Sequence, residues 1–311
     1  MMAAQSMPHL IESLARTRGR MQADAVLGPA TWFRVGGAAE IFVRPADTSD
    51  LAEFLAALPL EVPVTVIGAA SNLIIRDGGI AGVVVRLARG FGDVDVQADG
   101  LVAGAAALDA VVAEHAAQAG LAGLEFLSGI PGAIGGAVAM NAGAYGSDVA
   151  STLDWAEIVT RQGEIVRLSC VELDLSYRHS ALPPESVVVR ARFMARKGDG
   201  AAIAARMAEI RTSREATQPT RARTGGSTFR NPPGARAWEL IEAAGCRGLQ
   251  RGGAQVSQKH CNFMINTGAA TAAELEGLGE DVRRRVKAAT GIDLAWEIKR
   301  LGMPGPRAVT P

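Results

Sequence analysis

Glycine is the residue that most constrains how this chain can fold. The chain has 36 glycines in 311 residues, and they cluster at 68–104, 120–146 and 225–253. The clusters lie in loops between apolar runs, where a residue without a Cβ atom allows positive φ angles or a close approach of the backbone to a ligand. We therefore expect the ligand-binding segments of the protein within these clusters.

The overall composition narrows the class of protein. Hydrophobic residues make up 48% of the chain and charged residues 21%, and the formal net charge is +0. This balance gives no electrostatic reason to expect a nucleic acid or an anionic membrane surface as partner. The sequence has no signal-peptide pattern near its start and no run of about 18 apolar residues. We expect a soluble cytoplasmic protein that binds small molecules and does not insert into a membrane.

The spacing of cysteine and histidine predicts neither a disulfide framework nor a metal site. Cys170, Cys246 and Cys261 are odd in number and form no CxxC pair, the spacing typical of structural zinc. The histidines form no HExxH pair. We expect reduced thiols and no bound metal.

The spacing of apolar residues predicts a chain in which helices and strands are mixed. Helices are predicted at 48–58, 107–120, 201–216 and 237–248, and a capping box of Thr271 and Glu274 opens another that ends at Gly291. Strands are predicted at 31–45 (two, around Gly36 and Gly37), 63–68, 82–87, 155–168 (a hairpin turning at Gly163), 186–198 and 294–302.

A short polar turn follows the strand predicted at 63–68. The strand ends at Gly68, and Ala69-Ala70-Ser71-Asn72 forms the turn. Consecutive backbone N–H groups in such a turn form a nest for an anion, and serine and asparagine side chains add donors. This arrangement suits a pyrophosphate; a plain hairpin turn is the alternative.

The segment 123–146 interleaves glycines with apolar residues, and Glu125 is its one charged residue. Because no amphipathic period runs through it, we expect its glycines outside helices, with the backbone against a flat ligand such as a nucleotide. A tightly packed structural loop is the alternative.

The usual nucleotide-binding fingerprints are absent. No Gly-Lys dipeptide occurs, which excludes a P-loop, and no GxGxxG follows a predicted strand. A dinucleotide would therefore have to bind through another fold.

Six motifs follow one another along the chain. They are IGAASNLIIRDGGIAGVVV (67–85), EFLSGIPGAIGGAVAMNAGAYG (125–146), SYRHS (176–180), GGSTFRNP (225–232), KHCNFMIN (259–266) and LAWEIKRLG (294–302). Together they resemble the UDP-N-acetylenolpyruvoylglucosamine reductase family, flavoproteins that make UDP-N-acetylmuramate for bacterial cell-wall synthesis. The resemblance covers roughly residues 24–302. Because Tyr145 and Tyr177 are the only tyrosines, the chain resembles the shorter (type II) form, which lacks a further tyrosine-bearing loop.

The resemblance implies an α+β fold. An FAD-binding type-2 (PCMH-like) module of two subdomains would be followed by a C-terminal α+β substrate-binding domain. The implied bounds are 1–86 and 87–217 for the two FAD-binding subdomains, 218–302 for the substrate-binding domain and 303–311 for a disordered tail. The family further implies non-covalent FAD, NADPH as co-substrate, a UDP-sugar substrate and a monomer in the bacterial cytoplasm that serves peptidoglycan synthesis, cell shape and division.

The resemblance also implies which residues contact the FAD. From the first strand pair and the polar turn these are Arg34, Gly68, Ser71, Asn72 and Leu73. From the glycine-rich segment they are Gly129, Ile130, Pro131, Gly132, Gly135, Gly136, Asn141 and Gly143. The family knowledge and the glycine argument therefore select the same two segments.

In the family, NADPH reduces FAD, and a hydride then passes to the terminal carbon of the enolpyruvyl group, so that negative charge develops on the adjacent carbon. Arg178 matches the arginine that faces the substrate carboxylate, where a planar guanidinium forms bidentate bonds. Ser227 matches the serine that returns a proton to the carbon. Glu297 matches a glutamate that stabilises the charge, which requires a protonated carboxyl.

Each of these residues has an ordinary alternative role. A single arginine such as Arg178 is usually solvated, Glu297 has the character of a salt-bridge partner, and Ser227 that of a turn residue. A serine held between two preceding glycines and the rigid Asn231-Pro232 also suggests a nucleophile, but no activating base is near in the sequence. A carbanion-like intermediate is strongly basic, so even a very weak acid can protonate it. Gly225 and Gly226 would leave room for the substrate.

Candidate substrate-binding residues follow from the need of a diphosphate for cationic and amide donors. They are Asn231, Lys259 and His260, and Tyr177 in the motif SYRHS is a further substrate-binding candidate. A packed core histidine is the alternative for His260.

Two other functions compete with this interpretation. An FAD-linked oxidase or dehydrogenase of an alcohol or lactone would keep the fold, but such enzymes often attach the flavin to histidine or cysteine, and neither cofactor segment contains one. A nucleotide-binding regulatory protein without turnover would not need Arg178, Ser227 and Glu297 together.

Overall fold

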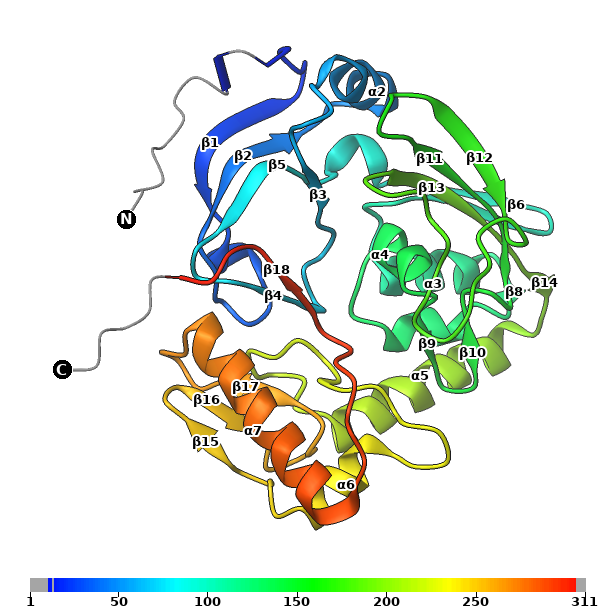
Figure 1. Cartoon of the computed structure of the whole chain (residues 1–311). Helices are drawn as coiled ribbons and strands as arrows, with labels where there is room; N and C mark the ends of the chain where they lie inside the picture. Colours follow the sequence, from blue (N-terminus) through cyan, green and yellow to red (C-terminus); the bar gives the residue numbers. More distant parts are fainter. Residues whose placement is uncertain (1–10, 13, 306–311) are drawn as a thin grey trace. The chain divides into compact units, whose positions relative to one another are not determined.

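The computed structural model describes residues 11, 12 and 14–305, and Figure 1 traces it along the chain. The chain forms two compact units that interleave in the sequence. Unit 1 consists of Met1–Ala25, Ala39–Gly68 and Ala81–Gly200, and unit 2 of Val26–Ala38, Ala69–Ile80 and Ala201–Pro311. The part of the expected C-terminal tail beyond residue 305 lies outside the described residues.

The first sheet of unit 1 has the strand order β1-β2-β5-β3, and β3 runs parallel to β5. Its strands are β1 (Arg20–Val26), β2 (Ala38–Arg44), β3 (Val64–Val66) and β5 (Ile80–Val85). The apolar side of helix α2 (Thr48–Ala57) packs in a core that this sheet shares with the second sheet, and this core includes Leu51, Phe54, Leu55, Val43, Val83, Val85 and Val187. The helix predicted at 48–58 and the strands predicted at 63–68 and 82–87 are confirmed.

The second sheet of unit 1 is antiparallel, with the order β12-β11-β13-β7-β6. Its strands are β6 (Val94–Gln97), β7 (Gly100–Gly104), β11 (Leu153–Val159), β12 (Ile165–Ser169) and β13 (Val187–Met194). Helix α3 (Asp109–Gln118) and the short helix α4 (Ile134–Ala139) follow β7 in the chain. The helix predicted at 107–120, the hairpin at 155–168 and the strand at 186–198 are confirmed.

Shorter elements complete unit 1. They are the 3₁₀ helices η2 (Arg89–Phe91) and η3 (Glu125–Gly129), and two pairs of two-residue strands, β8 (Leu121–Ala122) with β14 (Arg196–Lys197) and β9 (Gly143–Ala144) with β10 (Ser147–Asp148).

Unit 2 is organised around helix α7 (Ala272–Thr290), which lies across a small antiparallel sheet (Figure 1). The sheet has the order β15-β16-β17, with β15 (Gln250–Arg251), β16 (Ala254–Val256) and β17 (Met264–Asn266). The other elements are η1 (Gly28–Ala30), α5 (Gly200–Thr217), α6 (Ala237–Ala243) and the parallel pair β4 (Leu73–Ile75) and β18 (Lys299–Leu301).

Helix α7 begins and ends where its sequence predicts. The Thr271 hydroxyl accepts a hydrogen bond from the Glu274 N–H at 3.1 Å, and the Glu274 carboxylate accepts one from the Thr271 N–H at 3.0 Å. The helix stops at Gly291, whose φ of 75° favours glycine. Among the described residues, no helix combines the length and apolar character needed to cross a membrane.

Two strand predictions are wrong in part. Residues 31–35 form a turn instead of a strand, because the Thr31 hydroxyl donates to the Gly28 carbonyl at 3.0 Å and accepts from the Val35 N–H at 3.2 Å. Such local side-chain bonds compete with strand pairing. The strand predicted at 294–302 is regular only at β18, where it pairs with β4; Trp296 forms an isolated bridge with Phe229.

The expectation that the glycines of 123–146 lie outside helices is wrong for Gly135 and Gly136, which belong to α4. The Gly135 N–H donates to the Ala105 carbonyl at 2.9 Å, and a Cβ atom at Gly135 would lie 3.1 Å from the Ala105 Cβ. Close contact between backbones therefore accounts for Gly135, although α4 carries no amphipathic pattern.

A carboxyl group is buried at the start of α3. The Asp109 side chain is fully buried, and neither of its carboxyl oxygens has a hydrogen-bond partner within the described part of the chain. Burial raises the pKa of Asp109 from its ordinary 3.8 to about 8. The Asp109 backbone N–H donates to the Gly132 carbonyl at 3.2 Å, which joins α3 to the glycine-rich segment.

This carboxyl predicts a pH-dependent loss of stability. In the unfolded chain Asp109 ionises above pH 3.8, whereas in the folded chain it keeps its proton up to about pH 8, so the free energy of unfolding falls as pH rises through this window. Asp109→Asn removes the titration, so its melting temperature should exceed that of the wild type by an amount that grows from pH 5 to pH 8. Thermal unfolding across this range measures the difference, and parallel curves would contradict the prediction.

Candidate active site

Ser227 and Glu297 lie on neighbouring segments of unit 2. The segment 227–230 runs between two others, because Ser227 forms an isolated antiparallel bridge with Phe263 and Phe229 forms one with Trp296. The Thr228 carbonyl accepts a hydrogen bond from the Glu297 N–H at 2.8 Å. The backbone therefore brings together two residues that are 70 positions apart in the sequence.

Asn262 holds the Ser227 segment from the other side. Its buried side-chain amide accepts from the Phe229 N–H at 2.9 Å and donates to the Phe229 carbonyl at 2.8 Å. Its backbone carbonyl accepts from the Thr228 N–H at 2.7 Å. Asn262 was not predicted as a site residue; in the sequence it is one of two asparagines in the motif KHCNFMIN.

The two glycines before Ser227 have different roles. A Cβ atom at Gly225 would lie 2.3 Å from the ring of Phe33, which is fully buried, so packing inside unit 2 requires this glycine. The expectation that Gly225 leaves room for a substrate is therefore replaced by a structural reason. Gly226 has a φ of 78°, the left-handed region, and a Cβ atom there would meet nothing within 4 Å in the described chain.

The polar turn that precedes β4 lies beside Glu297. The Asn72 side-chain amide donates to the Glu297 carbonyl at 3.3 Å, and the Asn72 carbonyl accepts from the Lys299 N–H at 3.0 Å. The parallel pairing of β4 with β18 continues this contact from Leu73 onward. A candidate cofactor turn and a candidate catalytic residue are thus joined by hydrogen bonds within unit 2.

Arg178 belongs to unit 1 and lies at the tip of a tight turn. Ser176 and His179 exchange two backbone hydrogen bonds, of 3.1 and 3.0 Å, and Arg178 takes a left-handed φ of 58°. The Arg178 guanidinium lies over the Tyr177 ring, 5.2 Å from its centre. The motif SYRHS therefore encodes a turn that presents Tyr177 and Arg178 together.

The end of α4 fixes this turn. The Asn141 amide donates to the Ser176 carbonyl at 3.1 Å, and its oxygen accepts from the Ala150 N–H at 2.9 Å. The Ser180 hydroxyl donates to the Ala139 carbonyl at 2.9 Å. The side chain of Asn141, a predicted cofactor contact, is buried and occupied in supporting the Arg178 turn.

Four of the six predicted cofactor glycines form two contrasting pairs. A Cβ atom at Gly132 would lie 2.7 Å from an Asp109 carboxyl oxygen, and one at Gly143 would lie 2.7 Å from the Asp148 Cβ, so packing explains both. At Gly68 and Gly136 a Cβ atom would meet no described atom within 4 Å, and neither residue has a positive φ. The protein's own packing gives no reason for these two glycines, which fits a group lying against the backbone there.

The other cofactor candidates differ in how far they are exposed to solvent. Ser71, Ile130 and Pro131 are half-buried, whereas Gly129 is buried at the end of η3. Arg34 is exposed, has a φ of 59°, and donates a hydrogen bond to the Pro29 carbonyl.

The substrate candidates of unit 2 already have partners. The Asn231 oxygen accepts from the Ala237 N–H at the start of α6, at 2.9 Å, and the Lys259 ammonium donates to the Glu215 carbonyl. The Nδ1 atom of His260 accepts from the Asn262 N–H at 3.2 Å, and burial lowers the His260 pKa. His260 is therefore a neutral ring whose proton lies on Nε2. Across the described ranges, no three histidine, cysteine or acidic residues gather as metal ligands.

Comparison with known proteins identifies the family. Residues 39–169 match the FAD binding domain family, and residues 218–301 match the family described as UDP-N-acetylenolpyruvoylglucosamine reductase, C-terminal domain. The UDP-N-acetylenolpyruvoylglucosamine reductase of Acidiphilium cryptum is 68% identical over 304 residues, which cover 98% of each chain.

Solved structures agree with this result. The crystal structure of the UDP-N-acetylenolpyruvylglucosamine reductase of Thermus caldophilus superposes with a TM-score of 0.79 at 34% identity, covering 92% of this chain and all of that one. The 6-hydroxy-D-nicotine oxidase of Arthrobacter nicotinovorans superposes with a TM-score of 0.55 at 12% identity, over 90% of this chain and 88% of the oxidase, and shares the fold alone. The α+β fold is thus an FAD-binding module followed by a C-terminal domain, and the chain belongs to the UDP-N-acetylenolpyruvoylglucosamine reductase family.

Proposed function

We propose that this chain reduces the enolpyruvyl group of UDP-N-acetyl-3-O-(1-carboxyvinyl)-glucosamine to give UDP-N-acetylmuramate for peptidoglycan synthesis, with FAD as cofactor and NADPH as co-substrate. In a chain of this family, the observation that carries the proposal is the arrangement in unit 2. There the Ser227 segment, Glu297 and the Asn72 turn are joined by hydrogen bonds. We assign residues 1–86 and 87–217 to FAD binding and 218–302 to the substrate, in a cytoplasmic enzyme.

The polar turn and the glycine-rich segment would hold the FAD. Gly68 and Gly136 support this assignment, because they leave open space that the protein's packing does not explain. Ser71 and Asn72 add polar groups beside Gly68, as a pyrophosphate requires. When bound, FAD supplies hydride transfer from NADPH to the vinyl carbon of the substrate.

The chain's own residues then have two tasks. Reduction of a vinyl ether next to a carboxylate develops negative charge on the carbon that carries the carboxylate. The protein must stabilise this charge and return a proton to the carbon. A preorganised hydrogen-bond donor can perform the first task if its bonds to the substrate are stronger in the transition state than in the ground state.

Arg178 performs the first task in this proposal. Its guanidinium offers two parallel N–H groups to the substrate carboxylate, and these bonds strengthen as charge accumulates. The turn that carries Arg178 is fixed at both ends by Asn141 and Ser180, so the backbone of Arg178 starts from a held position and less ordering is needed during the reaction.

Ser227 performs the second task, and Glu297 assists. A serine hydroxyl is a weak acid, but the carbon it protonates is strongly basic. The backbone around Ser227 is held by Asn262 on one side and by the Glu297 segment on the other, which fixes the direction of the hydroxyl's Cα–Cβ bond. For the UDP group, Tyr177, Asn231, Lys259 and His260 are the proposed contacts, with His260 donating through Nε2.

An anaerobic titration tests the function. The purified protein should show a flavin absorbance spectrum that bleaches on addition of NADPH and recovers on addition of the enolpyruvyl UDP-sugar. A colourless protein that takes up no FAD would refute the cofactor assignment. A flavin that bleaches but does not recover with this substrate would move the function to another oxidoreductase of the same fold.

Substitution of Gly136 separates cofactor binding from folding. Gly136→Ala should raise the melting temperature of the flavin-free protein, because alanine in a helix is about 0.5–1 kcal/mol better than glycine, and should lower the flavin bound per chain. The control is Gly143→Ala, which places a Cβ atom against Asp148 and should lower the melting temperature. Wild-type flavin affinity in Gly136→Ala would show that nothing lies against this backbone.

Removal of the Ser227 hydroxyl should affect one half-reaction. Ser227→Ala should keep its flavin and its rate of flavin reduction by NADPH, while flavin reoxidation by the UDP-sugar slows by about 10²- to 10⁴-fold, the usual contribution of a positioned acid. Stopped-flow absorbance measures both rates. Ser213→Ala, on the exposed side of α5, is the control and should behave as wild type. An unchanged reoxidation rate would exclude Ser227 as the proton donor.

A further inference from the structure

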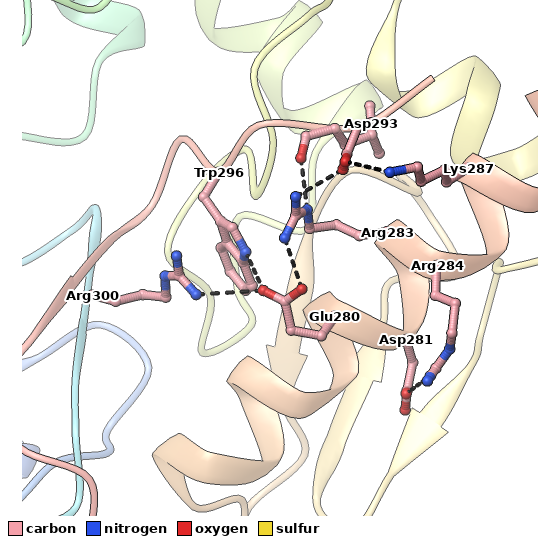
Figure 2. Close-up of polar contacts among 9 residues, drawn as sticks. Glu280, Asp281, Arg283, Arg284, Lys287, Asp293, Trp296 and Arg300 are labelled. Atoms are coloured by element: carbon pink, nitrogen blue, oxygen red, sulfur yellow. Dashed lines mark hydrogen bonds and ion pairs between the residues drawn. The ribbon is translucent and has the colours of Figure 1, made fainter. Parts of the chain in front are cut away.

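Trp296 connects helix α7 to the segments that carry Ser227 and Glu297. Its ring packs against Phe229 with the ring centres 5.1 Å apart and the planes tilted by 53°. The indole Nε1 donates to a Glu280 carboxylate oxygen at 2.8 Å (Figure 2). Phe229 is two residues after Ser227, and Trp296 directly precedes Glu297. The indole therefore packs against the segment that carries Ser227 and belongs to the segment that carries Glu297.

Glu280 gathers several contacts around this indole. Its carboxylate pairs with Arg283 at 2.8 Å and with Arg300 at 3.4 Å, and the Arg300 guanidinium lies over the Trp296 ring, 4.6 Å from its centre (Figure 2). Arg283 extends the network to the start of the segment, since it pairs with Asp293 at 2.7 Å and donates to the Leu294 carbonyl at 2.7 Å. The chain on both sides of Glu297 is thus attached to α7.

Gly279 shows that α7 is shaped for this indole. A Cβ atom at Gly279 would lie 2.2 Å from the Trp296 ring, so no other residue fits there while the ring keeps its place. A glycine inside a helix costs about 1 kcal/mol relative to alanine. The helix therefore accepts a less stable residue at the position where the indole packs.

We propose that Glu280 and Trp296 are positioning residues that align Ser227 and Glu297 for the proton-transfer step. This proposal rests on the proposed function. Trp296 acts on Ser227 through Phe229 and on Glu297 through the chain, and the hydrogen bond between the Glu297 N–H and the Thr228 carbonyl makes the two segments move together. Glu280 fixes the indole by accepting its N–H.

The exposure of Glu280 separates alignment from folding. Its side chain is 46% exposed, and ion pairs at such positions contribute little to stability. A misplacement of about 1 Å at a reacting group, by contrast, can slow a reaction by about 100-fold. Loss of the Glu280 carboxylate should therefore change the rate of the step that Ser227 serves more than it changes the melting temperature.

The test compares three variants of the FAD-loaded enzyme. Glu280→Ala removes the acceptor for the indole N–H, whereas Glu280→Gln keeps an acceptor oxygen at the same place. Asp281→Ala is the matched control, because Asp281 is the next residue of α7. It pairs with Arg284 (Figure 2) and with Arg251. Each is measured for flavin content, melting temperature, flavin reduction by NADPH, and flavin reoxidation by the UDP-sugar in H₂O and D₂O.

We expect Glu280→Ala to reoxidise its flavin about 10- to 100-fold more slowly than wild type, with unchanged flavin reduction and a larger solvent isotope effect, because proton transfer becomes more limiting. Glu280→Gln should recover most of the rate, and Asp281→Ala should match wild type. The positioning role is overturned if Glu280→Ala matches Asp281→Ala, or if its slower rate comes with an unchanged isotope effect. If the reduced flavin of the wild type is not reoxidised by the UDP-sugar, the proposed function itself is wrong. This outcome differs from failure of the positioning role, in which the wild type reacts and Glu280→Ala matches Asp281→Ala.

Discussion

The central constraint in unit 2 is the backbone pairing of the segment 227–230 with its two neighbours. The Thr228 carbonyl accepts a hydrogen bond from the Glu297 N–H, and the Thr228 N–H donates one to the Asn262 carbonyl. The Asn262 side-chain amide forms two hydrogen bonds with the Phe229 backbone, one to its N–H and one to its carbonyl. None of these segments is a regular strand of the small sheet. Their geometry is set by hydrogen bonds between residues far apart in the sequence, and the positions of both Ser227 and Glu297 follow from them.

In the sequence, the glycine clusters all point to ligand contact, whereas in the structure individual glycines have different causes. Gly225, Gly132 and Gly143 avoid contacts with Phe33, Asp109 and Asp148 inside the protein, and Gly226 and Gly291 adopt left-handed backbone. At Gly68 and Gly136 a Cβ atom would meet no described atom within 4 Å and φ is not positive, so neither packing nor conformation explains these two glycines. Clustering alone cannot separate these causes, because all of them require the same absence of a Cβ atom.

Local signals predicted the fold where local interactions decide it. The capping box of Thr271 and Glu274 and the stop at Gly291 defined α7 correctly, and β-branched runs defined β5 and β13. The turn at 31–35 was missed because a threonine hydroxyl satisfies the backbone there. Asn262, Trp296 and Glu280 could not be assigned from the sequence, since each acts across long separations that a single sequence does not record. The motifs found the site segments, but not the side chains that hold them.

The surroundings of Ser227 favour a proton donor over a nucleophile. A nucleophilic serine needs a base that can take its proton, with a third group that orients the base. The imidazole carried by the neighbouring segment, His260, already accepts the Asn262 N–H at Nδ1, and burial lowers its pKa. The centre of its ring lies 4.7 Å from that of Phe263, so His260 packs within the segment that pairs with the Ser227 segment. In the proposed function, His260 would help to fix the segment from which Ser227, a weak acid, delivers its proton.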